Sequence, residues 1–439
     1  MMNVIAGHRR FRYHLLLVVG IASLIRFGIL ALLWSSWDWR QGIISDQWNE
    51  LAINLVDHGV FAFFSAPDNP TIMRGPVFPF MEVPLYLLFG TNYAPWAIAL
   101  LILDTITCML LVLAVRSLWG DRPALLAGLF YSVNLPIIYY TAKISQVTSI
   151  MPFIVIWFYL LCLWERAYFS RWLPWLLGLV SGLMILNKTV YLPVPFVCAA
   201  VLLWIKRAEI RKIGHLIPLA IYLVTSVAVV APWTYRNYVV TNGTIVPVQN
   251  MFWELVVQDV LYHDLDAAGG RNRPEGELLQ YFMEKEAAIT TADGLSPTPP
   301  AGHRAAWESQ REKAFAKTAI KWIKEDPVKI VKIKAANLWH YWARAENWRK
   351  TQIFIVMQTV YLGAAIIGLV LLFRYRQLAR VKFALILIMI LWAEHSPVLG
   401  WGRFSLDLVP MLGAIFALGL DTWARHTSFR PDTAEGRIA

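Results

Sequence analysis

Two charged side chains, Asp46 and Arg74, stand out in the stretch Ser45–Phe80, which separates the first two long apolar runs of the chain. After Asp46, apolar residues recur from Trp48 at the spacing i, i+3, i+4, i+7 and i+8. This spacing predicts a short amphipathic helix that begins at Asp46 and lies along the outer membrane surface with its apolar stripe toward lipid. A carboxylate in this position can cap the helix. It can also take part in chemistry, because the helix end holds it in place.

Arg74 is followed by Gly75-Pro76 and then by Pro79. Because a proline disfavours helical backbone in the residue before it, Arg74 is expected on a stiff, irregular segment next to the second apolar run. A cation in this position could reach lipid head groups at the interface or bind an anionic substrate. Both interpretations stay open on these residues alone.

The composition defines the environment of these residues. Hydrophobic residues make up 58% of the 439 residues and charged residues 16%, whereas soluble chains carry roughly 25% charged residues. Runs of about twenty apolar residues, enough to cross a bilayer, recur along the chain. The first run, Tyr13–Trp34, is too long for a signal peptide and no small-residue cleavage site follows it. These features predict an all-α polytopic membrane protein.

We predict about ten spans. They lie near residues 12–34, 95–115, 123–141, 147–164, 172–187, 190–205, 214–232, 352–373, 381–394 and 406–424. Lys and Arg concentrate at both ends of the chain and in alternate loops, whereas the other short loops hold only Lys143, Lys188 and Arg403. Since cytoplasmic loops carry the excess of basic residues, both termini are expected in the cytoplasm. The stretch Ser45–Phe80 then faces outward.

The chain divides into three parts on this topology. Residues 1–235 form a transmembrane module with a first outer loop at 35–94, residues 236–350 form an extracytoplasmic subdomain, and residues 351–439 form a three-helix membrane segment with a cytoplasmic tail. Within the subdomain, residues 305–326 and 328–342 read as helices separated by Pro327. The second alternates lysines with apolar residues, which is typical of a helix at the membrane interface with its lysines toward head groups.

Other features point away from certain functions. The net charge of +11 comes largely from the cytoplasmic loops, so no nucleic-acid partner is expected. Cys108, Cys162 and Cys198 fall inside predicted spans and are expected to be packing residues. Asp104 lies in the middle of a span, where an ionisable group is costly, and we expect it to pair with a neighbouring span.

Several short motifs occur together in one order. Asp46 with its helix precedes Arg74-x-Pro-x-x-Pro, Lys188 follows the fifth span, Pro232-Trp-x-x-Arg236-Asn237 ends the seventh, and Gly402-Arg403-Phe404 precedes the last. This arrangement resembles the GT-C superfamily of polyprenyl-phosphate-sugar-dependent glycosyltransferases. Within it, the chain is most similar to bacterial relatives of the dolichyl-phosphate-mannose protein mannosyltransferases (glycosyltransferase family 39) and of the lipid A aminoarabinose transferase.

The resemblance implies a GT-C fold in a bacterial inner (plasma) membrane and an inverting hexosyl or pentosyl transfer on the extracytoplasmic face. The donor would be a polyprenyl-phosphate sugar and the acceptor a hydroxyl of a lipid, glycan or protein. In the family, the first-loop Asp takes the proton from the acceptor hydroxyl, and the matching residue is Asp46. The residues that match the family's donor-phosphate positions are Arg74, Lys188, Arg236 and Arg403.

The chain departs from the family at two acidic positions, where it carries Gln47 and Gln146. These amides, with His395, are expected to position the acceptor. Hard cations prefer carboxylate oxygens, so a divalent metal cofactor is doubtful, although Glu394-His395 with Asp46 could supply ligands.

Two other classes share some of these features. A lipid-linked glycan flippase would bind anionic head groups, but it would place ionisable residues along a pathway from both sides of the membrane. An O-antigen ligase or polymerase would transfer whole glycans from a diphosphate carrier, and it would carry paired arginines in a different large loop. The outward clustering of the motif residues favours the transferase.

Overall fold

The computed structural model describes residues 2–34, 47–64, 67–142, 144–207, 213–270, 275–345 and 348–428. Within these ranges every regular element is an α-helix or a short 3-10 helix, and no strand occurs. The predicted all-α class is therefore confirmed.

Helices coincide with each predicted span. They are α1 (Met2–Trp34), α4 (Ala94–Trp119), α5 (Asp121–Ser132) with α6 (Leu135–Ala142), α7 (Gln146–Arg166), α8 (Leu173–Asn187), η2 (Thr189–Tyr191) with α9 (Val194–Lys206), η3 (Ile213–Leu216) with α10 (Ile217–Val240), α15 (Trp348–Arg374), η5 (Leu378–Val381) with α16 (Lys382–His395), and η6 (Gly402–Leu408) with α17 (Val409–Ser428). In the described part of the chain, seven helices are long and apolar enough to cross a membrane, or eight if the bent pair α5–α6 counts as one span. The polytopic class is confirmed, and the count of ten stays a prediction.

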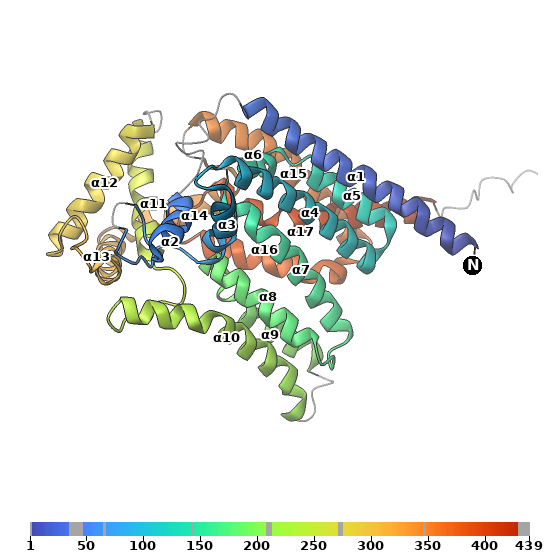
Figure 1. Ribbon diagram of the computed structural model, residues 1–439. Coiled ribbons are helices and arrows are strands. Elements are labelled where there is room, and N and C mark those ends of the chain that lie inside the picture. Colours follow the sequence, from blue (N-terminus) through green and yellow to red (C-terminus); the bar gives the residue numbers. More distant parts are fainter. Residues whose placement is uncertain are drawn as a thin grey trace, which may run out of the picture.

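Six further helices lie between these spans. They are α2 (Trp48–His58), α3 (Val77–Phe89), α11 (Phe252–Ala267), α12 (Glu275–Ala292), α13 (Arg304–Glu325) and α14 (Pro327–Ala343). The last two confirm the helices predicted on either side of Pro327. Helices α2, α11, α12 and α13 gather at the end of the molecule opposite the N-terminus (Figure 1). This arrangement agrees with the predicted topology, in which the first outer loop and residues 236–350 lie on the side of the membrane opposite the N-terminus.

The topology can be checked by labelling single cysteines with a membrane-impermeant maleimide in a variant that lacks the three native cysteines. Positions near 60, 145, 190, 290 and 400 should react from outside in intact cells. Positions near 120, 168, 208 and 378 should react only after the membrane is opened. A single reversed loop among these would separate residues that the site requires on one face.

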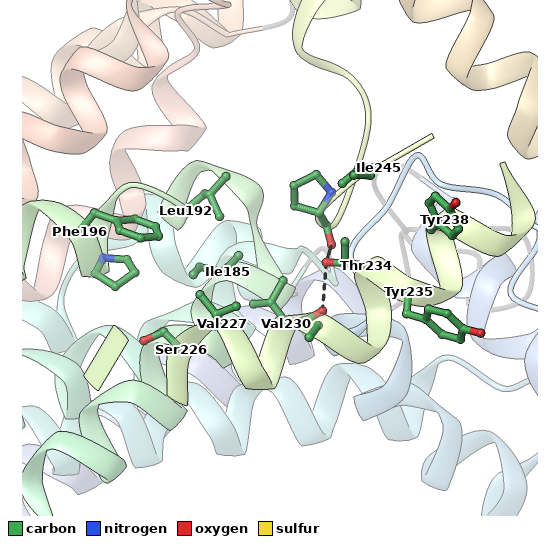
Figure 2. A pocket seen from close by; sticks show the side chains of 13 residues that line it. Ile185, Leu192, Phe196, Ser226, Val227, Val230, Thr234, Tyr235, Tyr238 and Ile245 are labelled. Atoms are coloured by element: carbon green, nitrogen blue, oxygen red, sulfur yellow. Dashed lines mark hydrogen bonds between the residues drawn. The ribbon is translucent and has the colours of Figure 1, made fainter. Parts of the chain in front are cut away.

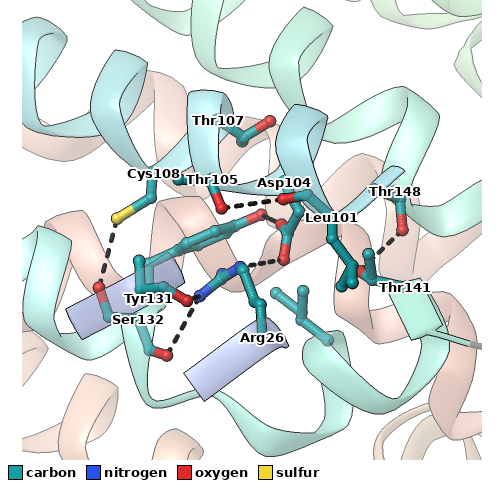
Figure 3. A network of polar contacts seen from close by, with 12 residues as sticks. Arg26, Leu101, Asp104, Thr105, Thr107, Cys108, Tyr131, Ser132, Thr141 and Thr148 are labelled. Atoms are coloured by element: carbon teal, nitrogen blue, oxygen red, sulfur yellow. Dashed lines mark hydrogen bonds and ion pairs between the residues drawn. The ribbon is translucent and has the colours of Figure 1, made fainter. Parts of the chain in front are cut away.

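A buried ion pair ties the first three helical segments of the bundle together (Figure 3). Arg26 Nε on α1 lies 2.6 Å from Asp104 Oδ2 on α4, and both side chains are fully buried. The Tyr131 hydroxyl of α5 donates to the same carboxylate, and Arg26 also donates to the Ser132 carbonyl oxygen at 3.3 Å. The expected pairing of Asp104 with a neighbouring span is confirmed. Since a buried pair is tolerated only when its partners satisfy one another, this network specifies how α1 packs.

Helix α2 was expected to turn its apolar stripe toward lipid, and this was wrong. Trp48, Leu51 and Ala52 are buried inside the protein. The Trp48 ring meets Phe78 of α3 edge-on at 5.7 Å between centroids, and Phe78 in turn packs against Trp96 of α4 at 5.6 Å. Helix α3, which the sequence did not predict, supplies the surface that covers the stripe.

Helix α14 carries an apolar stripe on its exposed side, as expected of an interfacial helix. Its exposed apolar residues are Val328, Val331, Leu338 and Trp339. Two of its lysines do not extend toward head groups, however. Lys329 Nζ lies 2.6 Å from Asp264 and Lys334 Nζ lies 2.5 Å from Asp259, both on α11. These pairs bind α14 to α11.

Candidate active-site cavity

A cavity of about 730 Å³ opens where the loop helices meet the ends of the spans. Its walls come from segments far apart in the sequence. Its polar and aromatic lining residues include Gln47, Trp48, Arg74, Gln146, Lys188, Gln249, Glu254, Gln258, Tyr262, Phe282, Glu286, Trp401, Arg403 and Phe404. The fold therefore gathers in one place most of the residues that the motifs singled out.

Five of the eight predicted site residues line this cavity, namely Gln47, Arg74, Gln146, Lys188 and Arg403. Asp46 lies outside the described residues, but its neighbour Gln47 is on the cavity wall. Gln47 also occupies the N-cap position of α2, with φ 58° and no side-chain cap hydrogen bond. If Asp46 were the N-cap, the helix would begin at Gln47, whereas the described helix begins at Trp48.

The loop that carries Arg74 lies directly against the end of α8. A Cβ atom on Gly75 would come within 2.3 Å of the Leu186 carbonyl oxygen, so only glycine allows this approach. Two residues after Leu186, the chain reaches Lys188. Arg74 itself lies with its Cζ 5.3 Å from the centroid of the Trp48 ring. The glycine therefore brings two cations of the cavity together, and the aromatic ring supports one of them.

Lys188 follows α8 in extended conformation and is held by Asp407 of η6. Its Nζ lies 2.9 Å and 2.8 Å from the two carboxylate oxygens, and the Tyr191 hydroxyl donates to Asp407 Oδ2 at 2.9 Å. Asp407 is fully buried, whereas the Lys188 side chain retains 11% of its exposure. This pair fixes the ammonium group at the cavity wall. Asp407 was missed in the sequence because it stands alone in an apolar segment.

Gln146 opens α7, and its side-chain amide donates to the Asn187 carbonyl oxygen. This bond ties the start of α7 to the residue that precedes Lys188. Gln146 thus contributes to the wall and helps to hold the neighbouring cation.

Arg236 does not line the cavity, although its motif predicted a place there. Its guanidinium donates to the carbonyl oxygens of Thr71 at 2.7 Å and Phe61 at 3.4 Å. It also lies 4.8 Å from the centroid of the Trp233 ring. These contacts hold Arg236 against the first outer loop, and its role at the donor phosphate stays a prediction.

His395 is also absent from the cavity wall. Its ring stacks between Tyr341 and Phe404, with centroid distances of 5.4 Å and 4.5 Å. Phe404 lines the cavity, so His395 lies behind the wall. Its acceptor-positioning role stays a prediction.

The wall contributed by α11 and α12 was not anticipated. Arg311 Nη2 of α13 lies 3.1 Å from Glu254 Oε1 and 2.8 Å from Glu286 Oε2. Gln258 Nε2 donates to Glu286 Oε1 at 2.7 Å. Burial raises the pKa of Glu254 to about 7, against the opposing effect of Arg311. The only signal in the sequence was the spacing of Glu254 and Gln258, which places them on one helical face.

Two carboxylates of α13 hold the parts of this wall in place. Glu312 accepts hydrogen bonds from the backbone N–H groups of Trp253 and Glu254 at 2.5 Å and 3.2 Å, and so satisfies the start of α11. Glu308 accepts from the Thr71 hydroxyl at 2.8 Å and the Ile72 N–H at 2.8 Å. Helix α13 therefore fixes both α11 and the first outer loop.

In the ranges that the structure describes, no group of three or more His, Cys, Asp or Glu residues could hold a metal ion. The set considered from the sequence included Asp46, which lies outside those ranges.

A second, apolar cavity of about 430 Å³ lies between α8, α9 and α10 (Figure 2). None of the residues that line it is charged. They include Ile185, Leu192, Phe196, Val227, Val230, Tyr235 and Tyr238. Ile185 and Leu192 stand on either side of Lys188 in the sequence, so this apolar space begins close to a cation of the polar cavity.

Comparisons with known proteins agree with the motifs. Residues 69–235 match the family described as dolichyl-phosphate-mannose-protein mannosyltransferase. No curated protein matches the chain by sequence.

Solved structures of an archaeal oligosaccharyltransferase share the overall fold. The oligosaccharyltransferase AglB from Archaeoglobus fulgidus, in complex with an inhibitory peptide and a dolichol-phosphate, aligns with a TM-score of 0.56 at 14% identity over 98% of this chain and 53% of that one. An oligosaccharyltransferase from the same organism, tethered with an acceptor peptide, gives a TM-score of 0.54 at 15% identity over 93% of this chain and 49% of that one. ArnT from Cupriavidus metallidurans bound to undecaprenyl phosphate gives 0.41 at 14% identity over 92% and 78%.

The present chain spans about half the length of the archaeal oligosaccharyltransferase. The alignment with that enzyme covers 98% of the present chain. The chain has the GT-C glycosyltransferase fold, and residues 69–235 carry the sequence pattern of the dolichyl-phosphate-mannose-protein mannosyltransferases, so the resemblance read from its motifs is confirmed.

Proposed function

We propose that this protein is an inverting glycosyltransferase that moves a sugar from a polyprenyl-phosphate donor to an acceptor hydroxyl on the extracytoplasmic face of a bacterial inner membrane. The observation that carries this proposal is the convergence of Arg74, Lys188 and Arg403 on one cavity, next to an apolar space large enough for part of a lipid chain. Residues 1–235 would supply most of the catalytic module, 236–350 would close it from outside, and 351–439 would add Arg403 and Asp407.

The chemistry assigns each part a task. The leaving group is a lipid phosphate, whose growing negative charge the three cations stabilise as the glycosidic bond breaks. Asp46, next to Gln47 on the wall, accepts the proton of the attacking hydroxyl. The isoprene units nearest the phosphate enter the apolar cavity beside Lys188. The archaeal oligosaccharyltransferase of similar fold was solved with a dolichol-phosphate, which supports a lipid phosphate as the common element.

A transporter is less well supported. The cations of the cavity lie at one end of the helical bundle, and the mid-membrane charges Arg26 and Asp104 are bonded to each other. A transfer assay with polyprenyl-phosphate sugars, run beside a transport assay in sealed vesicles, separates the two functions.

The Arg403→Ala variant should lose about 10- to 100-fold in kcat/KM for the lipid donor, because one charge-assisted hydrogen bond to phosphate contributes about 1.5–3 kcal/mol. Steady-state kinetics at varied donor concentration measure this loss, with thermal unfolding in detergent as the check on folding. Arg403→Lys should recover part of the activity, since it restores the charge but not the planar donor set. An unchanged kcat/KM in Arg403→Ala would remove this residue from the donor site.

A further inference from the structure

The polar cavity has two chemically different sets of wall residues. Two of its cations come from segments at the ends of membrane helices, with Lys188 after α8 and Arg403 in η6 before α17, and the third, Arg74, comes from the first outer loop. Its carboxylates, Glu254 and Glu286, come from α11 and α12, which lie in the group of helices at the outer end (Figure 1). A lipid phosphate stays at the membrane surface, near the cations. The second substrate must therefore approach from the side of α11 and α12.

We propose that Glu254, Gln258 and Glu286 form the acceptor subsite, and that this subsite takes the hydroxyl groups of an uncharged saccharide. The inference rests on the proposed function and adds the class of acceptor to it. Carboxylates accept hydrogen bonds from neighbouring hydroxyls, and the Gln258 amide can both donate and accept. This combination suits a ligand that presents several hydroxyls.

Aromatic rings stand beside these polar groups and complete the case for a sugar. Tyr262, Phe282 and Trp401 all line the cavity. The Tyr262 ring centroid lies 4.2 Å from that of Phe282 and 5.6 Å from that of Trp401. Apolar ring surfaces with a few convergent polar groups are typical of a ligand site. The apolar faces of a sugar ring can pack against such a cluster while its hydroxyls reach the carboxylates.

The charge on this wall disfavours an anionic acceptor. Arg311 is the cation that contacts both Glu254 and Glu286. With Arg74, which also acts on Glu254, two positive charges face the three carboxyl groups of Glu254, Glu286 and Glu312. The neighbouring Glu312 is bound to the backbone N–H groups at the start of α11. An acceptor that brought a carboxylate or a phosphate to this wall would meet like charge at short range.

The wall should respond to pH. The groups that act on Glu254 are Arg311 and Glu312 of α13, Glu286 of α12 and Arg74 of the first outer loop. With a pKa of about 7, Glu254 is mostly protonated at pH 6 and mostly ionised at pH 8. The ionised form accepts more hydrogen bonds, so saccharide binding should strengthen over this interval.

The test uses the full-length protein in phosphatidylcholine nanodiscs, without sugar-based detergent, and saturation-transfer difference NMR. The probes are methyl α-D-mannoside, methyl β-D-glucuronide and the peptide Lys-Ser-Lys. The mannoside should bind, more tightly at pH 8 than at pH 6, and the glucuronide should bind at least about tenfold more weakly. Glu254→Gln and Glu286→Gln should each weaken mannoside binding by about tenfold, the loss expected for a hydrogen bond to a charged group.

Glu284→Gln is the matched control, because Glu284 is exposed on α12 and bonded to Gln280, outside the polar cavity. It should bind the mannoside like the parent protein. Mannoside binding that does not change in Glu254→Gln, equal binding of the glucuronide, or preferential binding of the basic peptide would each overturn the proposal.

The experiment needs neither donor nor turnover, so its outcome is separate from that of the proposed function. If the protein transfers sugar but Glu254→Gln has the same acceptor KM as the parent, the proposed function stands and the acceptor subsite is rejected. Saccharide binding that depends on Glu254, in a protein that transfers no sugar, would do the reverse.

Discussion

The Asp46→Asn variant is expected to transfer sugar about 10²–10⁴-fold more slowly than the parent, with nearly unchanged stability and donor affinity. Asparagine keeps the size of the side chain but cannot take a proton at neutral pH, and a positioned general base contributes about this factor. The donor cations Arg74, Lys188 and Arg403 are untouched, so the KM for the donor should stay close to that of the parent. Single-turnover kinetics with saturating donor isolate the chemical step.

This variant also distinguishes a base from a helix cap. Asn and Asp rank about equally as N-caps, so a capping role would survive the change. Among the described residues, the N-cap position of α2 is Gln47, whose side chain makes no cap bond. A kcat within a few-fold of the parent would leave the mechanism without its base.

The Lys188→Ala variant should be both inactive and unstable. Asp407 is fully buried and bonded through both oxygens to Lys188 Nζ. Removing one partner of a buried pair leaves an uncompensated charge and costs about 3–5 kcal/mol. The variant should therefore unfold at a clearly lower temperature in detergent. Because it is destabilised, its loss of activity does not by itself show that Lys188 binds the donor.

A double variant separates the two effects. Lys188→Ala with Asp407→Asn removes the orphaned charge, and the Asn side chain can still accept the hydrogen bond from the Tyr191 hydroxyl. Its unfolding temperature should return most of the way to that of the parent, while kcat/KM for the donor stays about 10- to 100-fold low. Recovered activity in the double variant would show that Lys188 serves Asp407 rather than the phosphate.

Local patterns in the sequence predicted much of the fold because they depend on neighbours only. Helical spacing predicted α2, and the break at Pro327 predicted α13 and α14. Helix α3 was missed because Pro76 and Pro79 were read as breakers. The structure places Pro76 at the N-cap and Pro79 within the first turn, where the missing N–H has no intrahelical partner to lose, and it tolerates Pro84 inside the helix.

Residues that depend on distant partners could not be predicted in this way. Asp407 meets Lys188 only through the packing of η6 against the end of α8, and Glu254 reaches the cavity only because α13 holds the start of α11. Arg236 shows what a motif leaves undetermined. Its motif is intact, but the carbonyl oxygens of Thr71 and Phe61 occupy its guanidinium, and a motif carries no information about that competition.

The most direct test of the account measures sugar transfer by the purified full-length protein in sealed proteoliposomes. A panel of synthetic polyprenyl-phosphate sugars is offered, and both the transfer product and the movement of the donor across the membrane are followed. The account predicts a product of inverted anomeric configuration, formed by the parent and formed much more slowly by Asp46→Asn and Arg403→Ala. Donor translocation without transfer, or transfer only from a diphosphate-linked glycan, would contradict it.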